Sequence, residues 1–206
     1  PDGVFPSNHL SESLKNLVES FKYLPGIGEK TAERLAFSVL DLEDEQVSLF
    51  CDSLLGVKKK IHPCPICNTY TDTNLCFICS DIARDKTTLC VVEDTKNVFL
   101  FEKLGMFHGM YHVLDGLISP LDGVNPEDIG LDKLIDRIKQ ENFKEVIFAF
   151  KPSIEGETTS LYIKRVLDGM GVVVTRLASG VPMGADMEYV DSLTLERALN
   201  DRKEIE

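Results

Sequence analysis

The residue types best suited to chemistry are four cysteines arranged as two C-x-x-C pairs, Cys64 with Cys67 and Cys76 with Cys79. Each pair can aim two thiolates at one point, and two such pairs build a closed tetrahedral zinc site. A closed site leaves no position for water, so the sequence predicts one structural Zn²⁺ per chain. Four reduced core cysteines or a redox C-x-x-C are the alternatives, and the doubled spacing in a polar segment favours zinc. His62 lies close by, but four thiolates already complete the shell.

A second group of residues is suited to binding phosphate. Gly26 and Gly28 allow a tight turn and a close approach of the backbone to a ligand. The helix expected to follow offers open N–H groups and the positive end of its dipole. Lys30 and Arg34, four residues apart on one helix face, can add charge-assisted contacts. The segment 24–32 resembles the helix-hairpin-helix motif, which contacts DNA through phosphates without reading sequence.

Two other structures could give this pattern of residues. One is a plain helical turn without a ligand, and the other is a P-loop. The P-loop fails because the Gly-Lys pair is interrupted by Glu29 and no strand precedes it. A single hairpin contacts only a short stretch of DNA, so we expect self-association to supply further copies of the hairpin. Lys58, Lys59 and Lys60 form a weaker second DNA candidate, since a solvated helix end explains them equally well.

Composition limits the class of protein. The net charge of −12 argues against a broadly basic surface, so any DNA contact must be local. No apolar run approaches the ~20 residues that span a bilayer, and the first five residues show no signal peptide. The lone cysteines Cys51 and Cys90 have apolar neighbours and are predicted to be buried. A reducing, cytosolic location is expected, with no membrane partner.

Acidic residues form a third group. Residues 88–180 resemble the Toprim domain of topoisomerases and primases, with Glu93 matching that family's glutamate. Active members carry an Asp-x-Asp pair that holds Mg²⁺, but this chain has Lys151 and Ser153 at those positions. Phosphoryl chemistry needs carboxylates to fix the metal, and a lysine repels it. The resemblance therefore implies a Toprim-like domain that catalyses no reaction.

These acids have several possible roles. Glu93, Asp94, Glu155 and Glu157 are interpreted as an acidic rim that binds a partner protein. A solvated rim and a weak single-ion site are the alternatives. A metal-dependent Toprim nuclease or primase is the rival function, and it lacks the Asp-x-Asp. A nucleotide-binding regulator is a third possibility, and no G-x-G-x-x-G follows the first strand.

Periodicity predicts the elements that position these groups. Helices are expected over 11–24 and 29–40, and a third, capped by Asp41, runs to the lysine triplet. Strands are expected over 88–92, 109–114, 145–150 and 172–175, helices over 96–104, 131–140 and 158–167, and a long ordered loop over 116–130. Two apolar stripes accompany the first and third helices: Leu14, Leu17, Val18 and Phe21, expected to be buried between subunits, and Val47, Phe50, Cys51, Leu54 and Leu55.

The predicted fold is a multi-domain combination of α+β and α/β parts. Residues 1–61 form a helical domain with the hairpin and residues 62–81 a zinc ribbon. Residues 82–180 form a Toprim-like, doubly wound, mostly parallel sheet, and residues 181–206 a C-terminal extension.

The order hairpin, four-cysteine ribbon and degenerate Toprim domain resembles the recombination mediator family RecR, from about Leu10 to Arg202. Further matching stretches are 111–114, 118–123, 175–182 and 194–199, and departures fall at Asp115 and Lys151. The resemblance implies a DNA-repair scaffold that forms a ring-like oligomer, a dimer or tetramer, around DNA. It also implies the partners RecO and RecF, and help in loading RecA onto single-stranded DNA.

Overall fold

The computed structural model describes residues 9–206, so the expectation for the first five residues lies outside the described part. The chain divides into two compact units, residues 1–60 and 61–206. Among residues 9–206, every helix is too short or too polar to cross a lipid bilayer.

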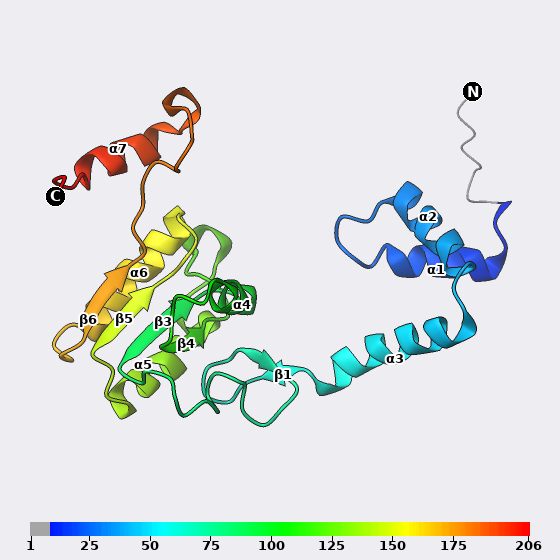
Figure 1. Ribbon diagram of the computed structural model, residues 1–206, viewed down its shortest axis with the longest axis horizontal. Helices are drawn as coiled ribbons and strands as arrows, with labels where there is room; N and C mark the ends of the chain where they lie inside the picture. Colours follow the sequence, from blue (N-terminus) through cyan, green and yellow to red (C-terminus); the bar gives the residue numbers. More distant parts are fainter. Residues whose placement is uncertain (1–8) are drawn as a thin grey trace. The chain divides into compact units, whose positions relative to one another are not determined.

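The first unit is helical, with α1 (Glu12–Phe21), α2 (Glu29–Val39) and α3 (Asp44–Lys60) (Figure 1). Helices α1 and α2 pack against each other, with Val18, Ala32 and Ala36 buried at the centre. The other apolar residues of α1 that pack there are Leu14, Leu17 and Phe21. The two alanines of α2 let the helices approach closely, so this stripe packs in part within the unit, and its contact with another subunit stays a prediction.

Helix α3 differs from the expectation in two ways. It begins at Asp44 rather than after a cap at Asp41, and the Glu43 N–H donates to the Gln46 side chain at 2.9 Å. Its apolar stripe is not buried: Phe50, Leu54 and Leu55 are exposed, and so is Cys51, which was predicted to be buried. The reason is that no residue of α3 is buried against the described part of its unit.

The second unit is built on a sheet of four parallel strands in the order β4-β3-β5-β6 (Figure 1). The strands are β3 (Thr88–Val92), β4 (Met110–Val113), β5 (Glu145–Phe148) and β6 (Val173–Arg176). The crossover helices are α4 (Thr95–Leu104), α5 (Leu131–Gln140) and α6 (Ile154–Leu167). Right-handed crossovers place α4 on one face and α5 and α6 on the other. The predicted doubly wound parallel sheet is confirmed.

Sequence patterns located these elements well, apart from α6. That helix starts four residues earlier than expected, because the Ser153 hydroxyl accepts a hydrogen bond from the Gly156 N–H at 3.0 Å and caps it. Cys90 is buried in the sheet, as predicted, and so is His112. The segment predicted as an ordered loop holds the short helices η2 (Pro120–Asp122) and η3 (Pro126–Ile129). After β6 come η4 (Met187–Tyr189) and α7 (Ser192–Asn200).

The cysteine-rich segment belongs to the second unit and covers one edge of the sheet. Its hairpin consists of β1 (His62–Pro63) and β2 (Tyr70–Thr71). The Val113 N–H in edge strand β4 donates to the Cys67 carbonyl at 2.8 Å, and the Asn68 amide donates to the Val113 carbonyl at 3.0 Å. The ribbon therefore satisfies backbone groups that an open sheet edge would leave exposed.

Candidate functional site

The four predicted metal ligands converge. The sulfur atoms of Cys64, Cys67, Cys76 and Cys79 all lie within 4.8 Å of one another. Tetrahedral Zn–S bonds would separate the sulfurs by roughly 3.8 Å, and the Cys67 and Cys76 sulfurs already lie 3.5 Å apart. Among residues 9–206, this is the one group of three or more cysteine, histidine or acidic ligands close enough to hold a metal, and His62 is not part of it.

The surroundings of the Cys76 sulfur favour a charged thiolate, whereas hydrogen bonds within the cluster and burial raise the pKa of the Cys67 and Cys79 thiols. Hydrogen bonds from Cys67 and Cys79, with further help from backbone N–H groups, lower the pKa of the Cys76 thiol. The Cys79 N–H lies 3.4 Å from the Cys76 sulfur, and the Thr69 N–H lies 3.5 Å from the Cys67 sulfur. Zinc binds thiolates rather than thiols, so these donors suit the same metal as the four sulfurs.

The segment predicted to bind phosphate forms a tight turn before α2. Gly26 has a φ of +81°, a conformation that side chains disfavour, and the Ile27 N–H closes the turn onto the Leu24 carbonyl at 3.3 Å. Gly28 is the N-cap of α2 and supplies no side-chain cap to that helix. A Cβ atom on either glycine would meet nothing within 4 Å, so the space in front of α2 is open. Lys30 and Arg34 are both exposed.

One residue that contacts the hairpin, Lys22, was not predicted from the sequence. Lys22 pairs with Glu29 at 2.7 Å and with Glu19 at 3.0 Å, and these hydrogen bonds raise its pKa, Glu29 having the larger effect. Glu29 stands in the first turn of α2, where its charge would repel a phosphate. Lys22 offsets that charge, and its proximity depends on the fold of the hairpin rather than on a motif.

The acids interpreted as one rim fall into separate environments. The Glu93 carboxylate accepts a hydrogen bond from the Lys151 N–H at 2.6 Å. Asp94 caps α4 by accepting from the Lys96 N–H at 2.8 Å. Both acids line a hollow at the carboxyl ends of β3 and β5, together with Lys151. Glu93 and Asp94 therefore each stabilise the local backbone. The binding of a partner protein by the acidic rim stays a prediction.

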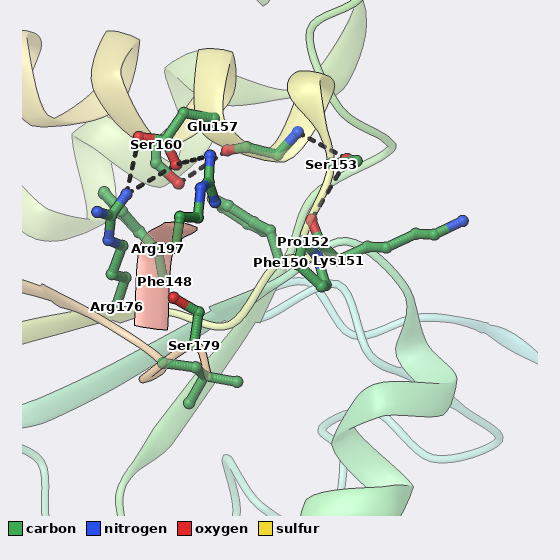
Figure 2. A pocket seen from close by; sticks show the side chains of 12 residues that line it. Phe148, Phe150, Lys151, Pro152, Ser153, Glu157, Ser160, Arg176, Ser179 and Arg197 are labelled. Carbon is green, nitrogen blue, oxygen red and sulfur yellow. Dashed lines mark hydrogen bonds and ion pairs between the residues drawn. The ribbon is translucent and has the colours of Figure 1, made fainter. Parts of the chain in front are cut away.

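Glu157 faces a different pocket. Its carboxylate accepts from Arg176 at 2.7 and 2.8 Å, and Arg197 of α7 lies 3.9 Å away (Figure 2). The Lys151 side chain points away from these groups (Figure 2). Glu155, in the first turn of α6, is partly exposed. The two arginines are a second feature that the sequence did not reveal, because they come from β6 and α7.

The glycine between the two glutamates has a structural role. A Cβ atom on Gly156 would collide with the carbonyl oxygen of Lys151. The Glu-Gly-Glu sequence thus forms the first turn of α6, where Gly156 packs against the backbone that joins β5 to this helix. It does not require a metal for its explanation.

Comparison with known proteins agrees with the architecture along the chain. Residues 14–57 match the RecR helix-hairpin-helix, 61–81 the four-cysteine zinc finger domain of RecR, 87–178 the Toprim domain and 180–203 the RecR C-terminal region. A curated relative from Staphylococcus haemolyticus, described as recombination protein RecR, is 47% identical over 197 residues. That alignment covers 96% of this chain and all of the relative.

Fold and site together define a class: Toprim-domain proteins that also carry a helix-hairpin-helix and a four-cysteine zinc finger. Within that class, the chain belongs to the RecR family of recombination proteins.

Proposed function

We propose that this protein is a DNA-binding scaffold of recombinational repair that carries one structural zinc ion and catalyses no reaction. The hairpin at Gly26 and Gly28 contacts the DNA backbone, and Lys30 and Arg34 strengthen that contact. The observation that carries the proposal is the open space in front of the uncapped α2 N-terminus, with two exposed cations on the same helix. Amides and cations so placed bind phosphate oxygens without regard to base sequence.

The absence of catalysis is supported by the residues at the Toprim positions. Lys151 and Ser153 stand where active members have metal-binding aspartates, and Ser153 serves as the cap of α6. Glu157 is already neutralised by Arg176. Without the two aspartates, and with Glu157 paired, the site offers poor support for the Mg²⁺ ions that phosphoryl chemistry uses.

The family supports a wider assembly. We propose a ring-like homo-oligomer that surrounds DNA and acts with RecO and RecF in loading RecA on single-stranded DNA. Glu93, Asp94 and Glu155 are the acids available for a partner, and Glu157 contributes less because its charge is paired. The exposed apolar side chains of α3 are the candidates for contact between subunits.

The salt dependence of DNA binding tests the hairpin. Each phosphate contact contributes about 0.9 to the slope of log affinity against log salt on duplex DNA. Lys30→Ala with Arg34→Ala is therefore expected to weaken binding to all sequences alike and to reduce the slope by nearly two per subunit in contact. Fluorescence anisotropy over a range of salt concentrations measures both quantities.

The matched control removes two positive charges elsewhere. Lys15 and Lys86 are exposed, and Lys15→Ala with Lys86→Ala should leave the slope close to that of the unmodified protein. Equal effects of the two double variants would mean that net charge, not the hairpin, governs binding. An unchanged affinity and slope for the hairpin variant would move the DNA site to the lysine triplet of α3, Lys58, Lys59 and Lys60.

A further inference from the structure

The residue two positions after Cys67 is buried beside the zinc site. Thr69 is fully buried, with 0% of its surface exposed. Its hydroxyl oxygen lies 3.1 Å from the Cys67 sulfur, and within residues 9–206 that sulfur is its one hydrogen-bond partner. A buried hydroxyl costs free energy unless it is hydrogen-bonded, so the sulfur contact accounts for the polar group at this position.

The direction of this hydrogen bond follows from the chemistry of zinc. A thiolate that binds zinc has no proton to donate, and its sulfur remains an acceptor. The Thr69 hydroxyl must then donate its proton to the Cys67 sulfur. The Thr69 backbone N–H, at 3.5 Å from the same sulfur, adds a second and longer contact.

Thr69 also connects two of the cysteines. Its carbonyl accepts a hydrogen bond from the Cys64 N–H at 2.8 Å, while its hydroxyl and N–H lie against Cys67. One residue therefore holds the backbone of the first ligand and the sulfur of the second. Its place directly before β2, next to Tyr70, fixes it to the ribbon hairpin.

We propose that Thr69 is a positioning residue of the zinc site, whose hydroxyl donates to the Cys67 thiolate and orients it toward the metal. This inference rests on zinc binding by the four cysteines. The hydrogen bond withdraws charge from the sulfur and restricts the rotation of the Cys67 side chain. Partners that contact metal ligands in this way commonly change metal affinity by about 10- to 100-fold.

The test compares Thr69→Val, which keeps the shape and removes the hydroxyl, with Thr69→Ser, which keeps the hydroxyl. In the intact protein, zinc transfer to a competing chromophoric chelator should be roughly 10- to 100-fold more favourable for Thr69→Val, and Thr69→Ser should stay near the unmodified protein. Thr73→Val is the matched control, because Thr73 lies in the same ribbon and is exposed.

A spectrum separates the hydrogen bond from packing. In cobalt-substituted protein, the sulfur-to-cobalt charge-transfer band should move to longer wavelength in Thr69→Val, since a thiolate without its donor gives up charge more easily. Thr69→Ser should restore the band. If Thr69→Ser behaves like Thr69→Val, or if Thr69→Val leaves both affinity and band unchanged, the inference is wrong. Purified protein that contains no zinc would instead contradict the metal site itself.

Discussion

At the scale of single residues, the burial of His112 makes the stability of the fold depend on pH. It lies in β4 with 1% of its surface exposed, and its Nδ1 atom is 3.3 Å from Arg137. The guanidinium can only donate, so the ring is neutral with Nδ1 as acceptor. Burial lowers the pKa of His112 to about 3, and the charges of Arg137 and Lys133 act in the same direction.

Stability should therefore fall as the pH falls. Between the unfolded pKa of about 6.5 and the lowered pKa in the fold, the unfolded chain binds a proton that the folded chain excludes. From pH 7 to pH 5, His112 should reduce the free energy of unfolding by about 2 kcal/mol. Chemical denaturation of zinc-loaded protein at both pH values measures this. In His112→Gln the pH-dependent loss should be smaller by that amount, and equal losses would contradict the assignment.

At the scale of elements, the zinc ribbon and the sheet depend on each other. The turn after Cys67 passes through Asn68, whose φ of 68° is unusual for a side chain other than glycine. The Asn68 amide donates to the Val113 carbonyl at 3.0 Å and to Asp115 at 2.9 Å. Asp115 thus contacts the ribbon. Because zinc would hold Cys67 in place, it should also stabilise the contact between the ribbon and edge strand β4.

Removal of zinc should expose one edge of β4. The Val113 N–H donates outward to Cys67 in the ribbon, whereas the neighbouring Leu114 N–H donates inward to Val92 of β3 at 2.9 Å. Amide hydrogen exchange after chelation should therefore accelerate at Val113 and much less at Leu114. The Leu114 amide is the internal control, because it directly follows Val113 in the chain. Similar protection of Val113 with and without zinc would show that the ribbon holds the edge without metal.

Helix α3 exposes several large apolar side chains. Leu49, Phe50, Leu54 and Leu55 are all exposed, and each large apolar side chain buried at a contact is worth roughly 1.5–3 kcal/mol. An isolated subunit would leave this apolar surface in water. The exposed side chains of α3 are thus a second candidate for the contact between subunits, beside the apolar stripe on α1.

At the scale of the whole molecule, self-association is the testable consequence. We expect at least a dimer in solution, and Leu54→Glu should shift the equilibrium toward smaller species, because a carboxylate in an apolar contact costs desolvation energy. Sedimentation at tens of micromolar measures the mass. Leu104→Glu is the control, since Leu104 in α4 is similarly exposed, at 60% against 57% for Leu54. A monomeric unmodified protein, or equal effects of both substitutions, would count against α3 as the contact.

Much of the molecule could be predicted from the sequence because the signals are local. The cysteine spacing predicted the four sulfurs that converge, and the Pro-Gly-x-Gly turn predicted the hairpin. Alternating strand and helix patterns predicted the parallel sheet, since each crossover needs a helix between neighbouring strands. The order of the modules, and the presence of Lys151 and Ser153 where Toprim enzymes have aspartates, can likewise be recognised from short segments of the sequence.

Features that depend on contacts between residues far apart in the chain could not be predicted from the sequence. The apolar stripe of α1 packs in part onto α2, while Cys51 is exposed because its helix has no buried residue. The pairing of Glu157 with Arg176 divided the predicted acidic rim. Periodicity reports which side of a helix is apolar, but not what covers it. Whether a charge is free or a stripe is buried depends on long-range contacts, and these are fixed only when the elements pack.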